Sequence, residues 1–158
     1  RLVGVQGLLD DFQEIARCFG RSWYDAALRS RLYSLTSTEG ADAQIKKHGT
    51  LDLVAEAGVR LLFQKSGDTR VLNGVEIYRS RVRDAAKWEG DLPFDIQFTD
   101  DVDDISRKLG AEPQSTHDDD DRQGRAIWTR GEFRIVVILD LIVNLIASIT
   151  VASAERWS

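Results

Sequence analysis

The two halves of this chain carry a similar pattern of apolar residues at an offset of about 74 residues, and no other feature constrains its fold as strongly. One shift without a gap aligns three apolar segments, and Arg60 with Arg134 is the one identical pair among them. The aligned apolar pairs are Leu53 with Ile127, Leu61 with Ile135, Phe63 with Val137, Leu72 with Ile146, Val75 with Ile149 and Ile77 with Val151. We therefore expect two pseudo-repeats, about 1–90 and 91–158, within one domain.

Period-two alternation in the aligned segments predicts an antiparallel meander in each half. The predicted strands cover 51–55, 59–63 and 71–78 in the first half, and 125–129, 133–139 and 145–152 in the second. Ser66-Gly67-Asp68 supplies a hairpin turn in the first half. The fold class that follows is α+β, with two helix/antiparallel-meander repeats forming one curved antiparallel sheet and helices packed on one face.

Helical periodicity precedes the first predicted meander. Apolar residues recur at three and four positions over 5–19, which Gly20 would end, and again over 22–35, for which Ser22 is the expected N-cap. The polar segment 36–49 is typical of a surface loop.

The second half repeats this order with one predicted helix. Thr99 is its expected N-cap, carboxylates at Asp100, Asp101, Asp103 and Asp104 complement the positive end of the helix dipole, and Gly110 ends it. A polar stretch over 112–124 follows, and its run of like charges favours a solvated loop.

The acidic balance of the chain excludes some classes of partner. A formal net charge of −5 and a pI near 5.1 argue against a nucleic-acid binder and favour a basic partner. Cys18 is the sole cysteine, so no intrachain disulfide forms and a cytoplasmic location is expected, although a removed N-terminal signal stays open. The apolar stretch 135–151 is interrupted by Asp140 and Asn144 and predicts buried strands, not a membrane span.

The sequence offers little for catalysis, and we expect no enzyme, cofactor or metal site. The motifs GxSxG, HExxH and CxxC do not occur, and the glycines near the start lack phosphate-loop spacing. Cys18 and His48 lack a third orienting group. The run from His117 to Asp121 lacks the alternate spacing of a calcium loop.

The remaining candidates are surface features that a protein partner can contact. Aromatic residues on or beside strands are either core members or anchors of a binding face, and charged runs are either solvated edges or steering groups. An apolar triplet lies where the repeat places a polar hairpin tip; it is either an exposed knob or a continuation of the two strands. The candidate partner-binding residues are Tyr78, Trp88, Asp118, Asp119, Asp120, Asp121, Trp128, Leu141, Ile142 and Val143.

The doubled order of helices, polar loop and meander resembles the tandem-repeat architecture of the beta-lactamase inhibitor protein family. Short phrases at 58–63, 88–93 and 109–113, followed by Trp128 and 146–151, also look like a bacterial group of toxin-neutralising immunity proteins. The resemblance covers roughly 19–151, and it implies a sheet with one face free to grip a protein. It transfers no contact residues, and Cys18 has no partner where the inhibitor relatives carry disulfides.

Three functions compete on this basis. The leading hypothesis is a non-enzymatic immunity protein that neutralises a cognate bacterial toxin by occluding its active site. The alternatives are an envelope assembly or scaffold protein of related fold and a small-ligand-binding domain, which would need a deep pocket lined by His48 or His117 with carboxylates. The sequence leaves the partner, the binding face and the oligomeric state open.

Overall fold

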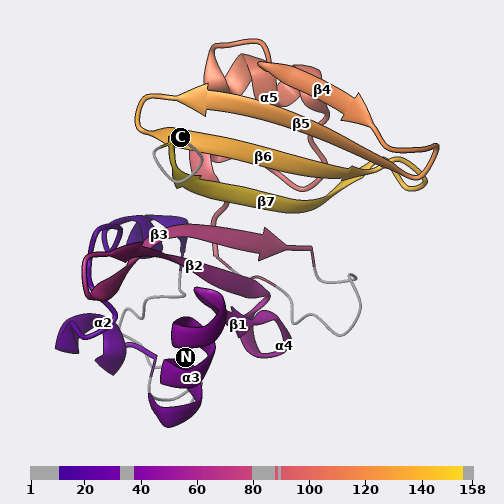
Figure 1. Cartoon of the computed structure of the whole chain (residues 1–158). Helices are drawn as coiled ribbons and strands as arrows, with labels where there is room; N and C mark the ends of the chain where they lie inside the picture. Colours follow the sequence, from indigo (N-terminus) through magenta and orange to yellow (C-terminus); the bar gives the residue numbers. More distant parts are fainter. Residues whose placement is uncertain (1–10, 33–37, 80–87, 89, 155–158) are drawn as a thin grey trace.

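One antiparallel sheet of seven strands organises the protein, as a computed structural model shows (Figure 1). The structure describes residues 11–32, 38–79, 88 and 90–154. The strand order across the sheet is β1-β2-β3-β7-β6-β5-β4, so two meanders meet where β3 pairs with β7. The predicted α+β class with a single antiparallel sheet is confirmed.

The strand bounds are close to those predicted, with one additional strand. They are β1 (Thr50–Leu53), β2 (Val59–Ser66), β3 (Thr69–Tyr78), β4 (Ser115–Asp118), β5 (Gln123–Arg130), β6 (Phe133–Asp140) and β7 (Leu145–Ser153). Strand β4 lies in the stretch that was expected to be a loop. The sequence does not reveal it, because its four side chains are all exposed and show no apolar alternation. Its backbone is nevertheless paired to β5, where it forms one edge of the sheet.

Alternating residues of the strands bury one face of the sheet beneath the helices. A single hydrophobic cluster joins strand residues such as Leu61, Val75 and Val137 to helix residues such as Ile15 and Ile105. The opposite face carries the intervening residues, among them Arg60 and Val136.

The helices of the first half depart from the prediction in three places. α1 (Phe12–Ala16) is shorter than the helix predicted over 5–19, because Asp11 is its N-cap and accepts the N–H of Glu14; residues 1–10 lie outside the described chain. α2 (Ala26–Ser30) begins at Asp25, whose carboxylate accepts the N–H groups of Ala27 and Leu28, whereas Ser22 pairs with Val71 in an isolated bridge. The short helix α4 (Val54–Ala57) follows β1, so Ala55 is helical and not part of the strand.

The segment predicted as a polar loop at 36–49 holds the longest described helix, α3 (Thr38–His48). Two side chains four residues apart, Ala41 and Ile45, are buried in the core. Glu39 in its first turn and Lys46, Lys47 and His48 in its last turn complement the helix dipole. The loop prediction was wrong because the apolar stripe is narrow and Gly40 interrupts the pattern.

The second half has one α-helix among its described residues, α5 (Val102–Leu109), and it ends at Gly110 as predicted. The N-cap is Asp101 and not Thr99: Asp101 and Asp104 form a reciprocal capping box, with oxygen–nitrogen distances of 2.8 and 3.1 Å. Before α5, a short 3₁₀ turn, η1 (Pro93–Asp95), forms part of the connector between the meanders.

The strands of the two halves keep the predicted offset, whereas the other elements do not. β2 starts at Val59 and β6 at Phe133, and a one-residue bulge falls on Asn73 in β3 and on Ala147 in β7. The segment equivalent to α3 holds β4 and a turn instead of a helix. The structure therefore does not establish the second half as a copy of the first.

Candidate functional site

The turn between β6 and β7 exposes two large aliphatic side chains. Ile142 is 68% exposed and Val143 is 51% exposed, while Leu141 is half-buried. The Asp140 carboxylate accepts the N–H groups of Ile142 and Val143 at 3.1 and 3.4 Å, so the turn has a defined shape. The apolar triplet is thus a four-residue tip and not a continuation of the strands.

The turn between β4 and β5 carries the run Asp118–Asp121 on the surface. The Asp120 carboxylate accepts the N–H groups of Arg122 and Gln123, and the Asp119 carboxylate lies 3.2 Å from the imidazole Nε2 of His117. The run is therefore an ordered hairpin turn whose carboxylates also face water. No group of three or more His, Cys, Asp or Glu side chains among the described residues is arranged to hold a metal ion.

These two turns lie side by side at one end of the sheet (Figure 1). The backbone N–H of Leu141 donates to the carbonyl of Arg122 at 2.8 Å. We call this composite surface, residues 118–122 and 140–144, the acidic tip. The structure thereby brings together two candidate segments that lie about twenty residues apart in the sequence.

A recess of about 270 Å³ lies beside the acidic tip. Its apolar walls come from Val102, Leu139, Leu141 and Leu145, and its rim includes the carboxylates of Asp101 and Asp103. The Asp103 side chain is exposed and makes no hydrogen bond or ion pair within the described chain. The recess adds apolar surface and negative charge next to the exposed Ile142 and Val143.

Arg79 fixes the acidic tip to the centre of the sheet, a role that sequence reasoning missed. Its guanidinium lies 3.3 Å from the Asp140 carboxylate and donates to the carbonyl of Ile146 at 3.1 Å. Arg79 is the last described residue before 80–87, which lie outside the described chain. The contact spans 61 positions, so no local pattern indicates it.

The charge difference between the halves is a signal that the sequence does contain. Residues 91–158 carry 14 acidic and seven basic side chains, whereas residues 1–90 carry 12 acidic and 14 basic ones. The net charge of −5 is therefore +2 in the first half and −7 in the second. Counting by halves would have pointed to the end of the molecule that bears the acidic tip.

Two of the aromatic candidates are core residues and cannot serve as exposed anchors. Trp128 is completely buried, and its indole N–H lies 3.2 Å from the Ala111 carbonyl and 3.4 Å from the Ser106 hydroxyl. Trp88 is 4% exposed. Each ring buries its apolar body while its N–H finds an acceptor, which is the usual arrangement of a tryptophan inside a protein.

Tyr78 lies on the sheet face opposite the helices and is half-buried. Its hydroxyl donates to the Glu76 carboxylate at 2.8 Å, and the Arg60 guanidinium lies 5.8 Å from the ring centre. Burial, followed by the hydrogen bond and charge of Glu76, raises the pKa of Tyr78 to about 12. The phenol is therefore neutral at physiological pH and belongs to a polar group separate from the acidic tip.

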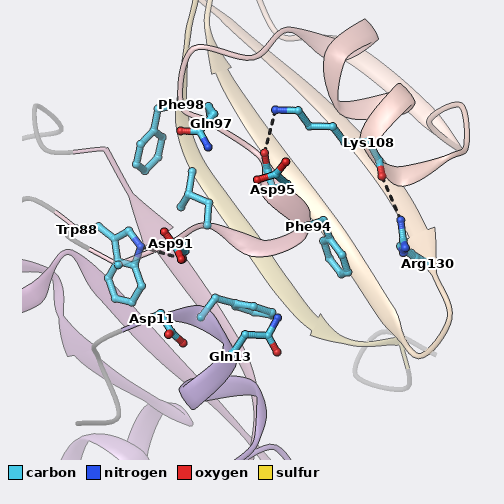
Figure 2. Close-up of a pocket in the computed structure, with 13 residues that line it drawn as sticks. Asp11, Gln13, Trp88, Asp91, Phe94, Asp95, Gln97, Phe98, Lys108 and Arg130 are labelled. Carbon is cyan, nitrogen blue, oxygen red and sulfur yellow. Dashed lines mark hydrogen bonds between the residues drawn. The ribbon is translucent and has the colours of Figure 1, made fainter. Parts of the chain in front are cut away.

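A second hollow lies between the halves, at the connector that precedes α5 (Figure 2). This connector cleft has a volume of about 630 Å³ and is lined by Trp88, Asp91, Phe94 and Asp95, among others. Neither His48 nor His117 lines it, so it differs from the cavity that the small-ligand alternative required.

Comparison of the chain with family models, with curated proteins and with solved structures finds no match. Within the described residues, the helices are too short or too polar to cross a bilayer.

Proposed function

We propose that this chain is a non-enzymatic protein-binding inhibitor that uses the acidic tip to contact its partner. In the form suggested by its resemblance to immunity proteins, it neutralises a cognate bacterial toxin by occluding the toxin's active site. The partner is a protein with a basic surface, and no cofactor takes part.

The exposure of Ile142 and Val143 beside an acidic turn is the observation that carries this proposal. A few side chains at the centre of an interface, surrounded by contacts that exclude water, supply most of the binding energy in protein complexes. The hydrogen bond from Leu141 to Arg122 holds apolar centre and acidic rim together before any partner arrives. Such pre-organisation reduces the entropic cost of association.

The charge of the tip favours a basic partner. Asp118, Asp119 and Asp121 are exposed, and the half of the chain that bears them has a net charge of −7. A toxin that cleaves nucleic acid needs a basic cleft, and an acidic inhibitor is steered toward such a cleft by long-range attraction. We therefore expect the association rate to fall as the salt concentration rises.

Protection of cells from the product of the adjacent gene tests the proposal. The two proteins are co-expressed, survival is scored, and the affinity of the purified pair is measured by calorimetry. Replacing both tip residues, I142S with V143S, should weaken binding by about thirtyfold, in the range of a hot-spot loss, and abolish protection.

Tyr24 provides the matched control because it is 66% exposed and lies away from the acidic tip. The variant Y24S should bind and protect like the unchanged chain. Full protection by the I142S/V143S protein, or an adjacent gene product that the chain neither binds nor neutralises, would refute the proposal.

A further inference from the structure

The large hydrophobic side chains that are exposed in the described part of the chain lie at two opposite ends of the sheet. Ile142 and Val143 belong to the acidic tip, whereas Tyr24, which is 66% exposed, lines a hollow beside the turn between β2 and β3. β3 pairs antiparallel with β7, so this turn and the acidic tip lie at opposite ends of the sheet (Figure 1). The length of β3, roughly 33 Å for ten residues, separates them, and one molecule cannot bring its two ends together.

The hollow beside Tyr24 has a volume of about 430 Å³. It lies between the segment that precedes α2, the last turns of α3 and the β2–β3 hairpin. We call it the basic hollow; its lining residues are Trp23, Tyr24, Asp42, Ile45, Lys46, Lys65, Asp68, Thr69 and Arg70.

The charge of the basic hollow is positive and is not used within the protein. Three cationic side chains that line it make no hydrogen bond or ion pair among the described residues: Lys46, Lys65 and Arg70. Of the two carboxylates there, Asp42 is bound to the Arg29 guanidinium at 2.9 and 3.2 Å, which leaves only Asp68 to oppose the three cations. The basic hollow therefore attracts an acidic surface.

Tyr24 offers apolar surface at the edge of the basic hollow, whereas the neighbouring Trp23 is 4% exposed and offers almost none. The Tyr24 N–H donates to the Ser22 hydroxyl at 3.1 Å, and that hydroxyl is hydrogen-bonded to the Thr69 hydroxyl at 2.6 Å. The Arg29 guanidinium lies 5.8 Å from the centre of the Tyr24 ring. These contacts fix the exposed ring beside the β2–β3 turn before anything binds to it.

The two ends of the molecule are complementary to each other. The acidic tip has exposed aliphatic side chains beside a run of carboxylates, and the basic hollow has an exposed aromatic ring beside uncommitted cations. We propose that the acidic tip of one copy of this chain docks at the basic hollow of a second copy. In this contact Ile142 and Val143 pack against Tyr24, and residues 118–121 face the three cations.

Such a contact is heterologous, because it joins two different surfaces and leaves one of each free on every pair. Copies therefore add head to tail. A docked acidic tip is covered, so self-association regulates how much of this surface is open to another protein.

The contact is smaller than a standard interface, and we expect a dissociation constant on the order of 10⁻⁴ M. At micromolar concentration the chain is then monomeric with its acidic tip free. The inference rests on the proposed function only in treating the acidic tip as a protein-binding surface, and its test needs no other protein.

Sedimentation velocity of the pure full chain, from about 10 µM to about 1 mM, brackets the expected dissociation constant. At low ionic strength the weight-average sedimentation coefficient should rise with concentration, and added salt should reverse the rise because the attraction between the charged ends is screened. A chain that stays monomeric over the whole range would overturn the proposal.

Variants of the two ends test which surfaces meet. I142S/V143S at the acidic tip and Y24S/K65E at the basic hollow should each weaken self-association about tenfold. Mixed together, the two variants should form a one-to-one dimer that does not grow, because each supplies the surface that the other lacks. Unchanged thermal unfolding of both variants verifies that these exposed substitutions preserve the fold.

K47E is the matched control, because it reverses the charge of an exposed lysine on α3 that does not line the basic hollow. It should weaken self-association clearly less than Y24S/K65E does. Equal weakening by K47E, or a mixture of the two end variants that stays monomeric, would overturn the assignment. The Y24S/K65E protein should keep its affinity for the toxin, so a failure of self-association and a failure of toxin binding are measured separately.

Discussion

The hairpin tips of the two meanders show how similar frameworks carry different surfaces. The β2–β3 tip is a two-residue turn, Gly67-Asp68, in which Gly67 has a φ of 60°. The β6–β7 tip has four residues and presents Ile142 and Val143 to solvent. Strands that align in the two halves build the common core, whereas the segments that differ carry the exposed apolar and acidic residues.

What adjoins each meander differs as well. Helix α3 packs Ala41 and Ile45 into the core beside β1, while the corresponding segment of the second half extends the sheet with the exposed strand β4. The first half is close to neutral and the second strongly acidic. The comparison teaches that the departures from the pattern, and not the pattern itself, are where a specific partner is to be sought.

The largest expected effect comes from Trp128, which has no aromatic counterpart in the first half. Replacing it by alanine should lower the free energy of unfolding by about 4 kcal/mol, because a fully buried ring and its hydrogen bonds are lost. Urea denaturation measures this, and W128F, which keeps most of the apolar volume, should lose clearly less. A loss below about 1 kcal/mol for W128A would mean that this core does not depend on the ring.

Substitution of Gly74 should destabilise the seam between the halves, where β3 pairs with β7. A Cβ at this position would lie 2.8 Å from the Cβ of Ala152 on β7, closer than such atoms approach. G74A should therefore destabilise the protein by about 2 kcal/mol through overpacking. Adding A152G should recover part of this loss, and the double-mutant cycle gives the coupling. Additive losses would show that the two strands do not meet closely at the seam.

The cap of α5 should contribute about 1 kcal/mol. D101A removes the carboxylate that accepts the Asp104 N–H at 2.8 Å, whereas D103A removes a charge from the same turn without removing a cap. Chemical denaturation should show a loss near 1 kcal/mol for D101A and within about 0.5 kcal/mol for D103A. Equal losses would assign the effect to charge and not to capping.

The smallest effect at neutral pH concerns Tyr78, on the sheet face of the first half. Its pKa in the folded state, about 12, lies above the ordinary value of 10.0. The stability that the neutral Tyr78 phenol contributes to the folded state is therefore complete below pH 10 and is lost as the pH rises toward 12. An ultraviolet absorbance titration should show one tyrosine ionising near pH 12, and Y78F should remove it. Ionisation of all three tyrosines near pH 10 would contradict the contact with Glu76.

The strands could be predicted from the sequence because each one buries a face of alternating residues. Leu61 and Phe63 in β2, like Ile135 and Val137 in β6, show this period directly. Strand β4 escaped prediction because edge pairing needs only backbone groups and leaves no apolar signature. The buried stripe of α3, Ala41 and Ile45, was too narrow to separate a helix from a loop.

The acidic tip could be predicted as two segments but not as one surface. Ile142 and Asp120 were each identified from their own neighbourhood in the sequence. Their proximity depends on the pairing register of β5 with β6, which positions the Arg122 carbonyl to accept from Leu141. Trp88 and Trp128 could not be assigned to the core or to a binding face from the sequence, because an aromatic residue near a strand has the same local pattern in both.

The position of β7 has a consequence for biosynthesis. This strand follows the other six in sequence, yet it lies at the middle of the sheet, between β3 and β6. During translation both of those neighbours leave the ribosome first and present unpaired edges until residues 145–153 emerge. The two meanders therefore join into one sheet only late in synthesis. A chain that stops before residue 145 exposes two unpaired strand edges, which can pair with strands of other nascent proteins.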